Sequence, residues 1–195
     1  MSDITLLDGS IGQELVKRSG DRATPLWSTR MILDDPDSIG ALHADYFAVG
    51  ATIATTNTYA VHRSRLERLG LEDQVPALID TAVAQAEMAR ARYNGGRIAG
   101  SLGPLLASYR PDLEPDIADA ALKFSELVQL MKPRVDLFLI ETVSSVQEAE
   151  GALRGTLGCG KPIWLALTVQ DEDGTRLRSG EPLKEIVPLL DKYQP

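Results

Sequence analysis

The sequence predicts an α/β fold built around a parallel β-sheet. Three observations predict it: short apolar runs recur along the chain, amphipathic helical patterns lie between them, and the two alternate in order. The chain has 195 residues, of which 44% are hydrophobic and 25% are charged. These values are ordinary for a globular protein and argue against intrinsic disorder. The length predicts one domain, since a domain typically takes about 100–200 residues.

Five apolar runs are expected to be strands. β-branched residues within them and turn residues at their ends favour strands over helices. The runs are apolar rather than strictly alternating, which is typical of strands buried on both faces of a parallel sheet. They cover residues 4–7, 51–56, 97–101, 135–140 and 163–169.

The first helix is expected to begin at Asp35 and Pro36, because Asp caps helices and Pro suits the first helical position. Apolar side chains at helical spacing then form one face: Ile39, Leu42, Tyr46 and Val49. A second helix is expected over residues 76–93, where Asn94 and Gly95 provide a stop signal. A third is expected over residues 116–131. Its apolar stripe comprises Ile117, Ala120, Ala121, Phe124, Val128 and Met131.

Two more helices are expected in the last third of the chain. Ser144 is expected to begin the fourth, with Gln147 completing a capping box, and that helix should end near Gly158. A fifth should begin near residues 181–182. Pro188 would lie inside it, which costs about 3 kcal/mol in a helix interior, so we expect a kink or an early end there.

Strand and helix therefore alternate five times, which implies a parallel sheet. An open doubly wound sheet and a closed (β/α)8 barrel both satisfy this order. Length favours the open sheet, because a barrel typically takes about 250 residues. In both architectures, functional residues lie at the carboxyl ends of the strands.

The composition limits the classes of partner and compartment. Lys and Arg number 20 against 28 Asp and Glu, a net charge of −8, which argues against nucleic acid or an anionic membrane as the main partner. Cys159 is the single cysteine, so no internal disulfide forms, which fits a reducing compartment. We see no signal peptide and no apolar run of the roughly 20 residues that a membrane helix needs. A cytoplasmic protein is expected.

Two carboxylates are expected at strand ends, Asp8 after the first strand and Glu141 after the fourth. Together they could hold a substrate ammonium or act as an acid/base pair. Each also has a plainer interpretation, since Asp8 precedes a glycine as in a tight turn, and strand-end carboxylates are often paired.

Other polar and aromatic residues follow the strands. Asn57, Thr58 and Ser101 either line a site or serve as turn and cap residues. Trp27 lies in a long loop that either walls a site or covers the core. Gly9 permits close backbone approach to a ligand. Neither a Walker loop nor a dinucleotide-binding fingerprint is present, so nucleotide binding has little support.

The sequence offers little for a metal. No C-x-x-C or H-x-x-x-H pair is present. His43 is expected to be a packed helix histidine, and His62 is expected to cap a surface turn rather than bind a ligand. Cys159 lies between two glycines before the fifth strand, away from the carboxyl ends, and is expected to be an inert thiol. No metal ligand is therefore assigned in this chain.

Taken in order, these residues resemble the homocysteine S-methyltransferase family. The resemblance spans essentially the whole chain, and its motifs are specific as a set although each is weak alone. They are LLDGSIGQEL from Leu6, PLWS from Pro25, HADY from His43, TTNTY from Thr55, GSLGP from Gly100, ET at Glu141 and DGTRLRSGEP from Asp173.

The resemblance implies a (β/α)8 barrel that transfers a methyl group to homocysteine sulfur, giving methionine, with a zinc ion held by three cysteines. It implies that Asp8, Gly9 and Glu141 hold the amino acid moiety of homocysteine. Asn57 and Thr58 would line the same mouth. Ser10 and Gln13 depart from the Gly and Thr that are commoner in the opening motif.

The resemblance also bears on the methyl donor. The PLWS stretch, which contains Trp27, is similar to the branch that uses a sulfonium donor, S-methylmethionine or S-adenosylmethionine. Betaine-using members carry Tyr directly after the site glutamate, where this chain has Thr142. The expected partners are therefore small molecules, homocysteine and the donor.

The family's zinc cysteines follow the sixth and eighth strands, whereas this chain ends at Pro195 after five units. We therefore expect one homocysteine-binding-type domain over residues 1–195, C-terminally incomplete, without catalytic zinc ligands and inactive alone. Two alternatives stay open. One is a short paralogue that binds an amino acid or a partner without catalysis. The other is a different barrel enzyme, such as a glycosidase, that uses Asp8 and Glu141 as acid and base.

Overall fold

The computed structural model describes residues 4–20 and 26–195, and its centre is a parallel sheet of four strands. The strands are β1 (Ile53–Thr55), β2 (Arg97–Leu102), β3 (Leu137–Val143) and β4 (Ile163–Leu167). Each strand pairs with the next one along the chain. This sequential order is that of a barrel sheet, because strand order reverses within a doubly wound sheet. The length-based preference for a doubly wound sheet is therefore wrong.

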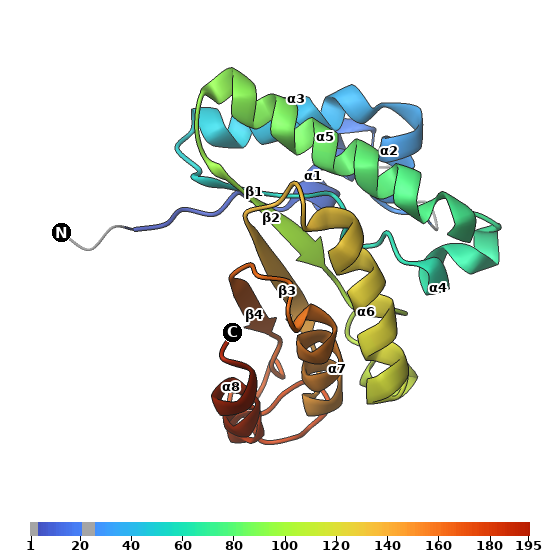
Figure 1. Ribbon diagram of the computed structural model, residues 1–195, viewed down its shortest axis with the longest axis vertical. Coiled ribbons are helices and arrows are strands. Elements are labelled where there is room, and N and C mark those ends of the chain that lie inside the picture. The colour runs from blue at the N-terminus through green and yellow to red at the C-terminus, as the bar shows by residue number, and fades with distance from the viewer. Residues whose placement is uncertain (1–3, 21–25) are drawn as a thin grey trace.

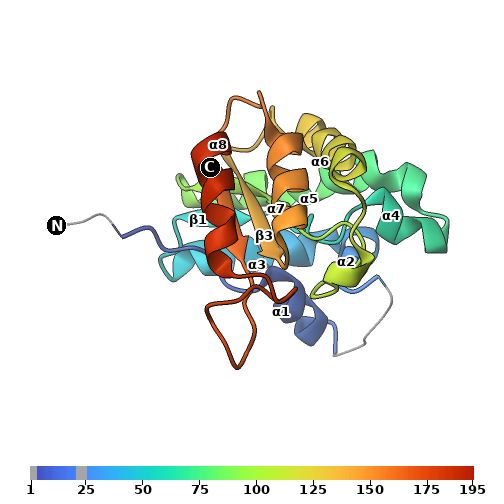
Figure 2. The same ribbon diagram turned by 90° about the horizontal axis from the view of Figure 1, so that it is seen from below.

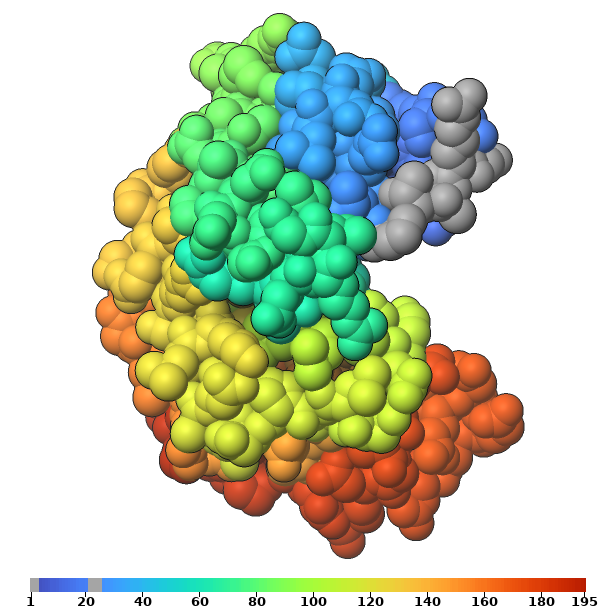
Figure 3. Space-filling model, turned by 90° about the vertical axis from the view of Figure 1, so that its right-hand side faces the viewer, coloured from blue at the N-terminus to red at the C-terminus, as the bar shows by residue number. Residues whose placement is uncertain are grey.

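Helices connect the strands along the outer side of the curved sheet (Figure 1). The α-helices are α1 (Ile11–Arg18), α2 (Thr29–Asp34), α3 (Pro36–Ala48), α4 (Arg63–Leu66), α5 (Val75–Tyr93), α6 (Ile117–Met131), α7 (Val146–Thr156) and α8 (Val187–Tyr193). Figure 2 shows α5, α6, α7 and α8 following one another around the strands. Figure 3 shows the result as an open arc, with the N-terminal and C-terminal parts at its two ends. No helix in residues 4–20 and 26–195 is long and apolar enough to cross a membrane.

The first expected strand, residues 4–7, forms only one isolated parallel bridge, between Leu7 and Ile53. The Thr52 N–H donates to Leu6 O at 2.8 Å and the Asp8 N–H donates to Ile53 O at 3.1 Å, so the segment follows the edge of β1. Within the described residues nothing pairs with its outer side, and Leu6 is 50% exposed. The expectation of a regular strand is therefore wrong, although the segment lies in the expected place.

Two helix starts are confirmed by their caps. The Asp35 carboxylate accepts from Ser38 N at 3.4 Å and Pro36 stands in the first turn of α3. The Asp116 carboxylate accepts from the N–H groups of Ala118 and Asp119 at the start of α6. One expected face residue is wrong: Val49 lies just beyond α3 and is 78% exposed, because the helix ends at Ala48.

The expected capping box of the fourth helix is displaced by one residue. Ser145, not Ser144, caps α7, and its Oγ accepts from Glu148 N at 2.9 Å. Glu148 Oε2 accepts in turn from Ser144 N at 2.7 Å. Gln147 instead donates from Nε2 to Pro115 O at 3.0 Å. Glu148, whose carboxylate closes the capping box, is therefore partly buried.

The last helical stretch, which contains Pro188, consists of two short helices rather than one kinked helix. A 3-10 helix over Leu183–Ile186 ends where α8 begins, and Pro188 stands in the first turn of α8. Proline is tolerated there because the first N–H groups of a helix have no helical partner. The expected interior kink is thus replaced by a boundary between two helices.

Helices α6 and α7 pack closely through glycine. A Cβ added to Gly155 would lie 2.5 Å from Phe124 Cβ and 2.9 Å from Ala121 O. Contacts this short require the helices to move apart, and Phe124 is 1% exposed in the core. Gly155 therefore sets the distance between these two helices.

Gly155→Ala is expected to lower the free energy of unfolding by about 1–3 kcal/mol, the usual cost of overpacking a core. The loss should appear in urea unfolding even though Ala favours helix by about 1 kcal/mol over Gly. Gly95→Ala is the matched control, because a Cβ there meets no atom within 4 Å. A Gly155 variant as stable as the wild type would show that this contact does not limit the packing.

Candidate functional site

A cavity of about 740 Å³ opens at the carboxyl ends of the strands. Residues from the start of the chain, from the end of β1 and from the end of β3 meet in its wall. Among the residues that line it are Asp8, Gly9, Trp27, Asn57 and Glu141. Five of the six residues that the sequence suggested for substrate binding therefore come together, and Thr58 does not.

Asp8 is held rigidly at the base of this cavity. The parallel bridge places it beside β1, where its carboxylate accepts from Thr55 N at 2.6 Å and from Thr55 Oγ1 at 2.7 Å. Its side chain is 2% exposed. Burial raises the pKa of Asp8, and the two bonds from Thr55 oppose that rise.

Glu141 is fixed by a bond from the neighbouring strand. Ser101 Oγ on β2 donates to Glu141 Oε1 at 2.5 Å. Burial is the main cause that raises the pKa of Glu141; the Ser101 bond opposes it, and the negative charge of Asp8 adds to it. The two carboxylates are therefore close enough to repel each other when both are ionised, and a cation placed between them would offset this repulsion.

The backbone around Glu141 is strained. The pairing of β3 with β4 shifts register between Ile140 and Val143, and Thr142 has a φ of 65°. A β-branched residue rarely adopts a positive φ, which costs roughly 1–3 kcal/mol and persists where the surrounding structure enforces it. The irregularity changes the direction of the chain directly after Glu141, as bulges beside active sites do.

Thr58 supports the cavity from behind. Its Oγ1 donates to Ser101 O at 2.8 Å and lies 2.8 Å from Thr56 Oγ1, and the residue is 2% exposed. Thr56 Oγ1 also accepts from Ser101 N at 3.0 Å. These bonds join the end of β1 to β2 and position Ser101, which holds Glu141.

Asn57 and Trp27 belong to one wall of the cavity. Asn57 Nδ2 donates to Ser28 O at 3.0 Å, which ties the Trp27 turn to the end of β1. The Trp27 ring meets Tyr59 edge to face at 5.7 Å between centroids. A Cβ on Gly12 would lie 2.2 Å from the Trp27 ring, so that glycine makes room for the indole.

Gly9 has a packing role beside its place in the cavity wall. A Cβ on it would lie 2.6 Å from Tyr46 Oη. Tyr46 Oη donates to Ser10 O at 3.3 Å, which holds the loop against α3. The close approach that the sequence suggested is therefore made by a tyrosine in this structure.

The two histidines are buried. His43 is 0% exposed on α3, with Nδ1 3.9 Å from Asp8 Oδ2, and burial lowers its pKa to about 4. It is the packed helix histidine that the sequence predicts. His62 is 1% exposed and its Nε2 lies 2.9 Å from Tyr59 O. The expected surface position of His62 is wrong, because the start of α4 is covered.

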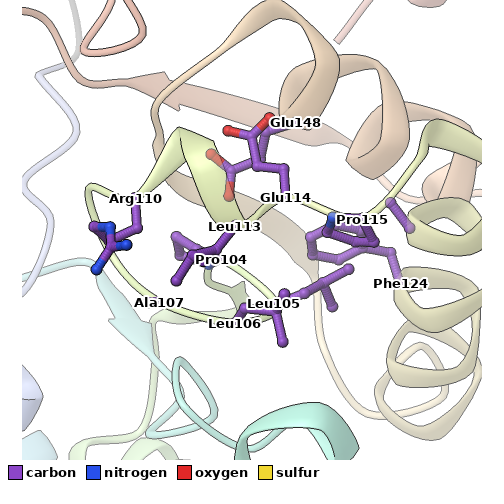
Figure 4. A pocket seen from close by; sticks show the side chains of 11 residues that line it. Pro104, Leu105, Leu106, Ala107, Arg110, Leu113, Glu114, Pro115, Phe124 and Glu148 are labelled. Atoms are coloured by element: carbon purple, nitrogen blue, oxygen red, sulfur yellow. The ribbon is translucent and has the colours of Figure 1, made fainter.

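A second cavity lies beneath the loop that leads to α6 (Figure 4). Its volume of about 10 Å³ is close to what one water needs. Glu114 and Glu148 face it, and Glu114 Oε2 accepts from Ser145 Oγ at 2.5 Å. Burial raises the pKa of Glu148 to about 7, with the neighbouring charge of Glu114 as a further cause.

Sequence reasoning missed several residues of this region. Arg65, Ser108 and Tyr109 line the main cavity, and Glu148 faces the small one. Arg65 and Glu148 resemble ordinary surface charges of helices, and no spacing distinguishes them. Thr55 stands in a motif that the sequence analysis singled out, but its two bonds to Asp8 depend on the bridge between distant segments.

The comparisons with known proteins agree on one family. A family model described as homocysteine S-methyltransferase matches residues 5–195. The chain is 30% identical to "Homocysteine S-methyltransferase" of Escherichia coli (strain K12), covering 98% of this chain and 66% of that protein. It is 27% identical to "Homocysteine S-methyltransferase YbgG" of Bacillus subtilis, again covering 98% and 66%.

A solved structure has the same fold. The metallated form of the homocysteine methyltransferase MmuM from Escherichia coli matches with a TM-score of 0.87 at 29% identity, over 98% of this chain and 72% of that one. The open sequential sheet is thus an incomplete (β/α)8 barrel. The chain spans about two thirds of the length of the curated relatives named above.

Proposed function

Because the chain belongs to the homocysteine S-methyltransferase family, we propose that it forms the homocysteine-binding part of an enzyme that methylates this thiol. Residues 1–195 act as one domain in this proposal. The observation that carries it is the pair of buried carboxylates, Asp8 and Glu141, on one cavity. Small molecules, homocysteine and a methyl donor, are the partners.

The amino group of homocysteine is bound between Asp8 and Glu141. Each carboxylate is already fixed, one by Thr55 and the other by Ser101, so little side-chain entropy is lost on binding. An ammonium ion offers three donors and offsets the repulsion between the two charges. Gly9 and Asn57 complete this side of the mouth, and Thr58 acts from behind through Ser101.

The methyl donor is a sulfonium compound, S-methylmethionine or S-adenosylmethionine. The edge-to-face pair of Trp27 and Tyr59 offers aromatic surface to that positive sulfur. In the transfer, the homocysteine thiolate attacks the methyl carbon in line, the new S–C bond forms, and the donor's S–C bond breaks. The donor leaves as a neutral thioether, so the chain has to supply alignment rather than leaving-group assistance.

The relatives raise the question of a metal, since the MmuM structure is a metallated form. Cys159, the single cysteine, precedes β4 and lies away from the carboxyl ends of the strands. Within residues 4–20 and 26–195, no group of three or more His, Cys, Asp or Glu side chains could hold a metal ion. The described residues therefore do not fit the zinc site implied by the resemblance.

Calorimetry with two thiols tests the proposal. Homocysteine is expected to bind, whereas 4-mercaptobutanoate, which lacks only the amino group, should bind about 10- to 100-fold more weakly, because it loses the charged hydrogen bonds. Equal affinity for the two thiols would refute the ammonium site. Methionine formation from S-methylmethionine then tests transfer. Homocysteine binding without methionine formation is the result expected of this chain alone, because its described residues offer no zinc site. Methionine formation by this chain would show that transfer does not need the zinc site implied by the resemblance.

A further inference from the structure

Arg65 is the one cationic side chain among the described residues that line the main cavity. It stands on the short helix α4, and its Nε donates to Pro104 O at 2.9 Å. Its Cζ lies 5.4 Å from the centre of the Tyr59 ring. The guanidinium is thereby held in one place by a carbonyl and an aromatic ring, neither of which neutralises its charge.

No carboxylate within the described ranges lies within 4 Å of Arg65. Nine other arginines in those ranges form ion pairs. The other described arginines without such a pair, Arg68, Arg92 and Arg97, are exposed to solvent, whereas Arg65 is partly buried. Its Nη2 is buried without any hydrogen-bond partner. Glu148 is the nearby acid, but its Oε2 is committed to Ser144 N. A partly buried cation without a carboxylate partner is costly, so its place in the wall of a cavity points to an anionic ligand.

The position of Arg65 indicates which kind of anion. Asp8 and Glu141 give the cavity a negative wall, whereas Arg65 adjoins Tyr59, which contacts Trp27. A sulfonium ligand with a carboxylate would meet the aromatic pair with its sulfur and Arg65 with its carboxylate, while homocysteine keeps its ammonium between Asp8 and Glu141. The cavity of about 740 Å³ is large enough to hold such a molecule beside homocysteine.

We propose that Arg65 binds the α-carboxylate of an amino-acid ligand in this cavity, on the side of the Tyr59–Trp27 wall. This inference rests on the proposed function and adds the recognition of the carboxylate to it. It makes the enzyme selective for sulfonium donors that are amino acids over simple alkyl sulfonium ions. A guanidinium suits this task because its planar donors match the two oxygens of a carboxylate.

The test measures affinities of the protein for S-methylmethionine and for (3-aminopropyl)dimethylsulfonium, which is the same ion without its carboxylate. The wild type is expected to bind the complete donor about 10- to 100-fold more tightly, as expected for one hydrogen-bonded charge pair. Arg65→Gln should remove that difference, and Arg65→Lys should restore part of it. Arg68→Gln is the charge-matched control, since Arg68 is exposed one turn away and should keep the wild-type preference.

Homocysteine binding by the same variants separates the outcomes. If Arg65→Gln weakens homocysteine but not the donor, the bound carboxylate is that of homocysteine, and the inference of donor selectivity is overturned. If the wild type binds both sulfonium ions equally, the inference is overturned without recourse to any variant, while the ammonium site stands. If Arg65→Gln weakens both ions equally, its role is in packing and the inference is likewise overturned. A protein that binds neither thiol nor donor refutes the proposed function as well.

Discussion

Asp8→Asn and Glu141→Gln are each expected to weaken homocysteine binding by about 10- to 100-fold, and the double variant is expected to abolish measurable binding. Each change keeps the shape of the side chain and removes one negative charge. A hydrogen bond to a charged group contributes about 1.5–3 kcal/mol, and both acceptors are partly buried in the wall of the cavity. Asn and Gln retain an oxygen that accepts from Thr55 or Ser101, so the fold should persist.

The same site predicts a dependence on pH. Burial raises the pKa of both carboxyls, so each takes up a proton at a higher pH than it would in water. The ammonium of homocysteine stays charged throughout this range. Affinity should therefore be full when both carboxyls are ionised and should fall as pH drops through their raised pKa values. Ser101→Ala removes a bond that favours ionised Glu141, so it should move the fall to higher pH.

Two matched controls accompany these variants. Asp45→Asn removes a carboxylate that is 61% exposed on α3, and Glu172→Gln removes an exposed one after β4. Both should bind homocysteine like the wild type. Calorimetric affinities that are unchanged in Asp8→Asn and in Glu141→Gln would show that the amino group binds elsewhere.

Glu148→Gln is expected to stabilise the protein at neutral and alkaline pH. The pKa of Glu148 is about 7 in the folded protein, against an ordinary value of 4.5. Between pH 4.5 and pH 7, the Glu148 carboxyl is ionised in the unfolded chain and protonated in the folded chain. Stability from this group is therefore complete below pH 4.5 and is lost as pH rises towards 7. At about 1.4 kcal/mol per pH unit, the loss amounts to up to about 3 kcal/mol.

Urea unfolding from pH 4 to 8 measures this effect. The free energy of unfolding of Glu148→Gln should fall less over that range than that of the wild type, because the amide has no charge to bury. Its oxygen can still accept from Ser144 N, so the cap of α7 is preserved. Glu185→Gln, an exposed control near the C-terminus, should keep the wild-type slope. If the free energy of unfolding changes with pH equally in Glu148→Gln and in the wild type, the pKa of Glu148 is not raised in the folded protein and its burial does not affect stability.

Much of this architecture is local in origin, and the sequence determined it. Asp35 caps α3 through an N–H group three residues away, so a short motif was enough to place that helix, and an apolar stripe at helical spacing placed α6. Apolar runs located four strands, and the chain order placed Asp8 and Glu141 at the carboxyl ends. Each of these features depends on neighbours a few residues apart, which is the range over which periodicity and capping act.

Tertiary structure alone decided the rest, because the deciding contacts join segments far apart in the chain. Ser101 meets Glu141 across 40 residues, and Thr55 meets Asp8 across 47. Thr58 lies behind the cavity, where its hydroxyl donates to Ser101 O. The Glu148 carboxylate is partly buried and accepts from Ser144 N at the start of α7. Arg65 and Arg68 lie three residues apart in one stretch of chain, yet one lines the cavity and the other is exposed. Burial and charge environment are set by what packs against a side chain, and no pattern within one segment contains that information.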